Sequence, residues 1–169
     1  MTLNNLKSVQ KTLGLLLMVF SFSMIAPFIV AGIFNDTYTA SSFLASFTFT
    51  LIVGLVLWIP SRKIDPEIRL KEGFVIVAAF WLILALFGSI PFLMLPESSL
   101  SITDAIFESA SGLTTTGATV LSSLDSLPKG LLYYRAQLQW IGGLGIIVLA
   151  VAILPLLGVG GMHLYRAES

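Results

Sequence analysis

The stretch that decides the fold is Ser111-Gly112-Leu113-Thr114-Thr115-Thr116-Gly117-Ala118-Thr119. It follows a segment too short to cross a bilayer and lies between two long apolar runs. Three threonines and a glycine disfavour helix, and irregular backbone at membrane depth survives only where it is buried in protein or lines a water-filled path. Carbonyl groups that face such a path can replace the water shell of a potassium ion. The stretch therefore predicts an ion-selective pore loop.

The composition indicates an integral membrane protein. Hydrophobic residues make up 56% of the chain and charged residues 11%, whereas about 25% of the residues of a soluble domain are charged. The net charge of zero gives no indication of a nucleic-acid partner. Cysteine is absent and His163 is the single histidine, which excludes a disulfide framework and a multi-histidine metal cluster contributed by this chain.

Four apolar runs predict the organisation of the chain. Each is about long enough to cross a bilayer, and the first has no convincing cleavage site, so we expect a retained helix rather than a signal peptide. We expect an all-α membrane protein with a two-helix transmembrane hairpin, a charged cytoplasmic loop, and one helix–re-entrant pore loop–helix unit of potassium-channel type. The expected boundaries are 1–60 for the hairpin, 61–72 for the loop and 73–169 for the pore unit, with a helix over 73–95, a pore helix over 101–112, a filter over 113–119 and a helix over 131–161.

The distribution of positive charge predicts the orientation. With the N-terminus inside, seven Lys and Arg residues lie on the cytoplasmic side, and only Lys129 and Arg135 lie on the outer side. Because cytoplasmic loops carry the excess of Lys and Arg, we expect a multi-pass protein with both termini of this chain in the cytoplasm. The segment 96–128 then enters the membrane from outside.

The candidate ion-binding residues are Thr114, Thr115, Thr116 and Gly117, which would coordinate the ion through backbone carbonyls. Gly117 permits backbone angles that other residues resist. The alternative is a threonine-rich outer loop that binds nothing, but the position after a half-membrane helix favours the pore. Four such loops surround one ion in a potassium channel. We therefore expect either four assembled chains or a longer protein that supplies three more loops.

Three charged residues near this loop leave alternatives open. Ser101 and Asp104 fit a capping box at the start of the short helix, so we expect Asp104 to cap the helix rather than attract cations. Glu108 fits either a structural pair or an outer cation site. Arg135 can pair with Glu108 or Asp125, or extend to the lipid headgroups, and we expect a buried pair.

A group of glycines predicts close helix packing around the pore helix. Small residues in a membrane helix let two backbones approach each other. We therefore expect packing positions at Gly142, Gly143 and Gly145.

Three long motifs resemble one known family. They are Asp104-Ala105-Ile106-Phe107-Glu108-Ser109-Ala110-Ser111-Gly112-Leu113-Thr114-Thr115-Thr116-Gly117-Ala118-Thr119, the run from Gln139 to Pro155, and the closing run from Gly160 to Glu168. The chain is similar to the TrkH family, the membrane pore subunits of bacterial Trk potassium-uptake systems in the Trk/Ktr/HKT superfamily.

The resemblance implies a hairpin followed by four pore units in one polypeptide, of which this chain is roughly the first third. It implies potassium ligands at Thr115 and Thr116, and no cofactor apart from the transported K⁺. It also implies a homodimer in the bacterial inner membrane, bound to TrkA, a cytoplasmic nucleotide-binding regulatory subunit.

Two functional classes remain. The first is potassium transport, in which this chain supplies the first of four selectivity-filter segments. The second is a membrane-embedded structural or assembly subunit with no conduction of its own, for which the threonine run should tolerate replacement. An enzyme is not expected, because no nucleophile–base pair or metal-ligand set lies within the apolar runs.

Overall fold

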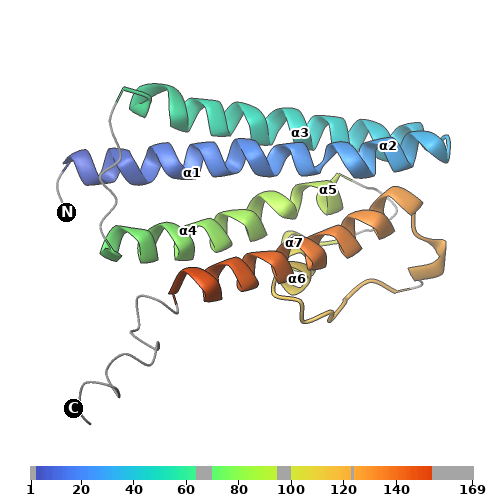
Figure 1. The fold of residues 1–169 in the computed structure, drawn as a ribbon. Coiled ribbons are helices and arrows are strands. Elements are labelled where there is room, and N and C mark those ends of the chain that lie inside the picture. Colours follow the sequence, from blue (N-terminus) through green and yellow to red (C-terminus); the bar gives the residue numbers. More distant parts are fainter. Residues whose placement is uncertain (1–2, 64–69, 95–99, 123, 154–169) are drawn as a thin grey trace, which may run out of the picture.

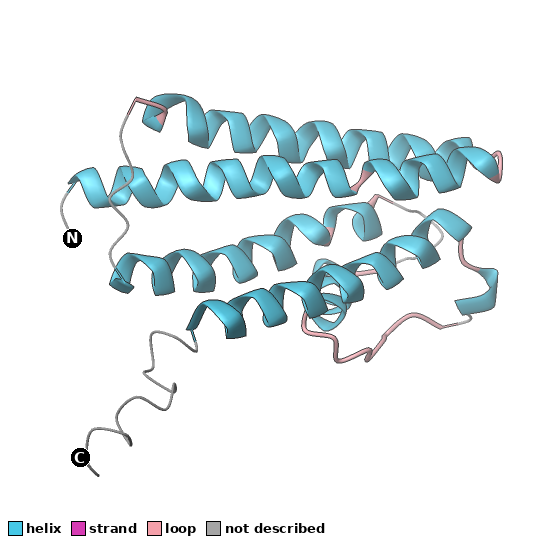
Figure 2. Ribbon diagram, viewed as in Figure 1, coloured by secondary structure: helices cyan, strands magenta, loops and turns pink. Residues whose placement is uncertain are grey.

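The computed structural model describes residues 3–63, 70–94, 100–122 and 124–153, and every regular element in these ranges is helical (Figure 2). The expected all-α fold is therefore confirmed. The elements are α1 (Leu3–Ser23), α2 (Ile25–Ile33), α3 (Thr37–Trp58), η1 (Ile59–Ser61), α4 (Leu70–Gly88), α5 (Ile90–Leu93), α6 (Ile102–Leu113), η3 (Leu124–Ser126) and α7 (Lys129–Ile153).

The first apolar run folds as two helices in line, α1 and α2, with a break at Met24. Pro27 explains the break, because proline has no N–H to donate to the carbonyl four residues earlier, which belongs to Ser23. The chain then turns at Asn35 (φ 56°), and the carboxylate of Asp36 accepts a hydrogen bond from the Thr39 N–H at 2.9 Å to cap α3.

The pore unit begins earlier than expected and contains an additional break. The expected helix over 73–95 starts at Leu70 and ends at Gly88, and the short α5 follows after Ser89. Pro91, at the start of α5, accounts for the break in the same way as Pro27. The last expected helix begins at Lys129, two residues before its predicted start, and its portion over 154–161 lies outside the described residues. Residues 64–69 of the expected loop also lie outside them.

Three helical spans in the described part of the chain are long and apolar enough to cross a membrane. They are Leu6–Ile33, Thr37–Ser61 and Gly73–Leu93. The fourth expected span, 131–161, extends past the described residues. These spans agree with the composition and with a membrane location.

The helices form two groups, and the short α6 lies beside the middle of α7 in the second group (Figure 1). α1 and α2 lie along α3 as an antiparallel hairpin, and α6 packs against both α4 and α7. α6 is seen nearly end-on in Figure 1, so its axis crosses those of its neighbours. The ring of Tyr134 joins the groups, because its centroid lies 5.3 Å from that of Phe43 and 5.6 Å from that of Phe92.

Candidate ion-binding loop

The pore helix α6 begins with the capping box that the sequence predicts. The Asp104 N–H donates to the Ser101 hydroxyl at 3.2 Å, and the Asp104 carboxylate accepts from the Ser101 N–H at 3.2 Å. Asp104 therefore stabilises the N-terminus of the helix, as expected. The 12 residues of α6 span about 18 Å, roughly half of a bilayer, so the helix ends at the depth where irregular backbone has to be protected.

The loop after α6 folds back onto the end of that helix. The N–H of Thr115 donates to the Gly112 carbonyl at 2.9 Å, and those of Thr116 and Gly117 donate to the Ser111 carbonyl at 3.0 and 3.4 Å. Positive φ angles at Thr115 (59°) and Gly117 (73°) produce this turn. Three successive N–H groups thus converge on the helix terminus, as in backbone that alternates between right- and left-handed conformations.

The same geometry gives the direction of the carbonyl groups. In a trans peptide unit, the C=O of one residue points opposite to the N–H of the next, and the described chain has no cis peptide. Because the N–H groups of Thr115, Thr116 and Gly117 point toward the helix, the carbonyls of Thr114, Thr115 and Thr116 point away from it. Residues 114–120 are exposed in this chain, so these three oxygen atoms remain available to a cation.

The threonine hydroxyls tie part of the loop to the helix. Thr114 Oγ1 donates to the Ala110 carbonyl at 2.8 Å and lies 2.9 Å from Thr116 Oγ1. Three residues before Thr114, the Ser111 hydroxyl donates to the Ala118 carbonyl at 2.6 Å. These bonds hold both sides of the turn against the last turn of α6.

Arg135 forms the expected buried pair, and its partner is Glu108. Arg135 Nε lies 3.1 Å from Glu108 Oε2, and the Glu108 side chain is 1% exposed. A carboxylate at that burial cannot serve as an open cation site at the outer mouth, which settles the alternative left open for Glu108. The second carboxylate oxygen accepts hydrogen bonds from the segment that follows the loop.

The glycines of α7 differ from the expectation in one respect. A Cβ at Gly142 would overlap the Leu113 carbonyl, so α7 packs directly on the start of the loop there. A Cβ at Gly143 would meet only Thr115 Cγ2, at 3.8 Å, which is an ordinary contact. The expectation that Gly143 is a tight packing position was therefore wrong. Successive helix residues point about 100° apart, and Gly142 is the one that faces α6.

Glycine is required at position 117 by the backbone conformation and not by a lack of space. Nothing lies within 4 Å of a Cβ built at Gly117. The requirement for glycine comes from φ of +73°, a conformation that costs a residue with a side chain about 1–2 kcal/mol. Thr115 also adopts positive φ and bears the same cost. The sequence did not predict this, because a β-branched residue rarely adopts positive φ.

Two polar side chains of α7 satisfy carbonyls at the helix breaks, and neither role was predicted from the sequence. Gln137 Nε2 donates to the Ser23 carbonyl at 2.8 Å, the group that Pro27 leaves without its helical partner. The Tyr134 hydroxyl donates to the Gly88 carbonyl at 3.0 Å, next to the second break. For Gln137, the signal that could have predicted this donor is Pro27, which leaves the carbonyl four residues earlier without its helical partner.

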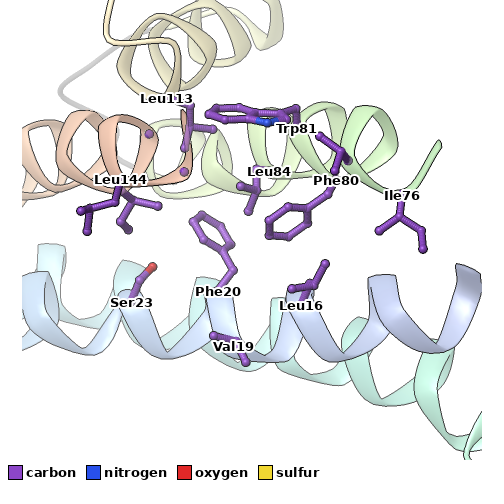
Figure 3. Close-up of a pocket in the computed structure, with 14 residues that line it drawn as sticks. Leu16, Val19, Phe20, Ser23, Ile76, Phe80, Trp81, Leu84, Leu113 and Leu144 are labelled. Carbon is purple, nitrogen blue, oxygen red and sulfur yellow. The ribbon is translucent and has the colours of Figure 1, made fainter. Parts of the chain in front are cut away.

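A cavity of about 570 Å³ lies near the loop but has the wrong chemistry for an ion (Figure 3). It opens between α1, α4, α7 and the end of α6, and its walls are almost entirely apolar, with side chains that include Phe20, Phe80, Trp81, Leu84, Leu113 and Leu144. An apolar wall cannot replace the water shell of a cation. Among the described residues no group of three or more His, Cys, Asp or Glu could hold a metal ion either. The loop, by contrast, presents carbonyl oxygen atoms in an exposed segment that a cation can reach.

Comparisons with known proteins agree with this geometry. The sequence model of the TrkH family, described as cation transport protein, matches residues 39–169. The Trk system potassium uptake protein TrkH of Escherichia coli (strain K12) is 53% identical over 162 residues, which cover 96% of this chain and 33% of that protein. The corresponding TrkH protein of Halomonas elongata is 51% identical over 164 residues, or 97% of this chain and 34% of that protein.

A solved structure is similar over nearly the same range. The crystal structure of the potassium transporter TrkH from Vibrio parahaemolyticus matches with a TM-score of 0.85 and 50% identity, over 93% of this chain and 33% of that one. The chain thus spans about a third of the length of these relatives.

Proposed function

Because the chain belongs to the TrkH family of cation transport proteins, we propose that it supplies the first of four selectivity-filter segments of a potassium-uptake protein. The relatives from E. coli and H. elongata are potassium uptake proteins by name, and this chain matches about a third of each. The observation that carries the proposal is the turn after α6, in which three successive N–H groups point back to the helix and the carbonyls between them point away.

In this proposal the potassium ligands are the backbone carbonyls of Thr114, Thr115, Thr116 and Gly117. Thr115 and Thr116 contribute the central pair, and the positive φ of Gly117 maintains the turn that directs them. The C-terminus of α6 adds partial negative charge behind the ion. Carbonyl dipoles held by the helix replace the hydration shell without a net charge that would trap the ion.

One loop covers only one side of an ion. The exposure of residues 114–120 fits a segment that the remaining three segments of a longer polypeptide would enclose. The assembly that we propose is a homodimer in the bacterial inner membrane, with both ends of this segment cytoplasmic and TrkA as the regulatory partner. It transports K⁺, requires no cofactor and catalyses no chemical reaction.

A full-length chimera tests the proposal. This chain replaces the matching third of the E. coli relative, and ⁸⁶Rb⁺ and ²²Na⁺ uptake are measured in proteoliposomes. The unaltered chimera should take up Rb⁺ selectively. Gly117→Val, which places a β-branched residue at positive φ, should abolish selective uptake, whereas Gly117→Asn should retain more of it because asparagine tolerates that conformation.

Gly32→Ala is the matched control, because no atom lies within 4 Å of a Cβ at that position and its φ is not positive. Selective uptake that persists in Gly117→Val would contradict the filter assignment. Normal uptake by a chimera with Thr114, Thr115 and Thr116 all replaced by alanine-glycine-alanine would instead favour the structural or assembly role.

A further inference from the structure

The segment that leaves the loop ends on one carboxylate oxygen of the pore helix. Glu108 Oε1 accepts hydrogen bonds from Thr119 Oγ1 at 2.5 Å, from the Val120 N–H at 2.6 Å and from the Leu121 N–H at 3.3 Å. Two of these donors belong to the backbone. Their positions therefore depend on the place of this oxygen, not on the identity of the side chains at 120 and 121.

The other carboxylate oxygen is held by a different helix. Arg135 Nε of α7 donates to Glu108 Oε2 at 3.1 Å, and the side chains of Arg135 and Glu108 are 15% and 1% exposed. At that burial the carboxylate is shielded from water, and charge-assisted hydrogen bonds are stronger than neutral ones. The Glu108 carboxylate thus links α7 through one oxygen to the loop exit through the other.

The loop is consequently fixed at both ends by α6. The entrance is fixed by the N–H groups of Thr115, Thr116 and Gly117 on the last carbonyls of the helix. The exit is fixed at Glu108, one helical turn before those carbonyls. The first donor to Glu108 is Thr119, only two residues after Gly117. A short segment held at both ends has little freedom to change the distance between its carbonyls and an ion.

We propose that Glu108 and Arg135 are positioning residues that fix the exit of the loop and thereby maintain potassium selectivity. The inference rests on the proposed function, since it assigns these residues a role in the same ion-binding segment. They do not touch the ion. Arg135 orients the Glu108 carboxylate, and Glu108 orients the backbone of residues 119–121.

Two double variants separate a role through opposite charge alone from a role through the hydrogen bonds to the loop. Exchanging the partners in Glu108→Arg/Arg135→Glu preserves opposite charges but places a side chain without any acceptor opposite the Val120 and Leu121 N–H groups. Replacing both in Glu108→Gln/Arg135→Gln removes the charges but retains an amide oxygen for those groups. If the hydrogen bonds to the loop maintain selectivity, the double glutamine variant should keep a higher ratio of Rb⁺ to Na⁺ uptake than the exchanged variant.

The experiment uses the full-length chimera and the ratio of ⁸⁶Rb⁺ to ²²Na⁺ uptake per inserted protein. We expect Glu108→Asp, whose shorter side chain withdraws the acceptor, and the exchanged double variant to lower the ratio at least about tenfold, because displacements of about 1 Å in positioned groups cost up to about 100-fold. The double glutamine variant should show a smaller decrease in this uptake ratio. Asp125→Asn, which removes an exposed carboxylate from η3, is the matched control and should keep the unaltered ratio.

The outcomes separate failure of this inference from failure of the proposed function. An exchanged variant with the unaltered ratio would overturn the positioning role, as would an unchanged ratio in Glu108→Asp. If a single variant does not insert, the comparison between the two double variants decides the question. A chimera that takes up no Rb⁺ selectively before any of these changes would instead contradict the proposed function.

Discussion

Alanine at Gly142 tests the packing of α7 on the start of the loop. The added Cβ would overlap the Leu113 carbonyl oxygen, and it would lie 2.6 Å from the carbonyl carbon and 2.9 Å from Cα of the same residue. These are backbone atoms, so no side-chain rotation can relieve the contact. Either α7 moves away from α6, or Leu113 moves and takes Thr114 with it.

The size of the effect follows from those distances. An ordinary contact for a Cβ begins at 3.4 Å, so the two backbones must separate by about 0.8 Å to restore it for the carbonyl carbon and by more for the oxygen. Overpacking of this kind costs about 1–3 kcal/mol. Intrinsic helix propensity acts in the opposite direction and favours alanine over glycine by about 1 kcal/mol, so the net destabilisation should be about 0–2 kcal/mol. The shift of the loop entrance should affect ion selectivity more than stability.

The adjacent residue provides the matched control. Gly143→Ala makes the same chemical change on the same helix, but its Cβ meets only Thr115 Cγ2, at 3.8 Å. In the full-length chimera we expect Gly142→Ala to lower the Rb⁺-to-Na⁺ uptake ratio at least about tenfold and Gly143→Ala to leave it nearly unchanged. Thermal unfolding in detergent should show equal or higher stability for Gly143→Ala. Equal uptake ratios for the two variants would refute the packing argument.

Three further outcomes are expected. A cysteine at the exposed Ser122 should react with an impermeant reagent outside intact cells, whereas one at the exposed Lys63 should not, and labelling at Lys63 would reverse the orientation. Gln137→Leu leaves the Ser23 carbonyl without its donor and should cost about 1–3 kcal/mol of stability. Thermal unfolding compares it with Gln139→Leu at an exposed position, and equal unfolding midpoints would contradict the role of Gln137 as that donor. The isolated 169-residue chain should show no selective Rb⁺ flux, because it supplies one of four filter segments, and robust flux would contradict the proposed stoichiometry.

Local patterns predicted much of the pore unit. The capping box of Ser101 and Asp104 depends only on residues three apart, and it forms as expected. A buried pair for Arg135 was also expected, because a buried charge in a membrane requires a partner, but the sequence left Glu108 and Asp125 open as that partner, and the structure shows Glu108. The membrane class and the all-α fold followed from apolar runs of spanning length.

The errors arose where tertiary contacts decide the outcome. Sequence spacing identified a group of glycines on α7, but only the rotation of that helix against α6 shows that Gly142, not Gly143, meets the Leu113 carbonyl. The positive φ of Thr115 conflicts with the preference of a β-branched residue, so no local rule predicts it. Hydrogen bonds to the loop hold it there, and their geometry depends on the surrounding fold.

The hairpin α1–α3 contributes no residue to the loop, yet it is connected to it through α7. Gln137 of α7 donates to the Ser23 carbonyl at the break in the first span, and Arg135 of the same helix holds the Glu108 carboxylate. About two turns further along, Gly142 packs on Leu113. A displacement of the hairpin would therefore shift α7. Because Gln137, Arg135 and Gly142 lie on this one helix, the contacts of α7 with Glu108 and with Leu113 would shift as well. The break at Pro27 is part of this arrangement, because it leaves the Ser23 carbonyl without its helical donor and so free to accept from Gln137.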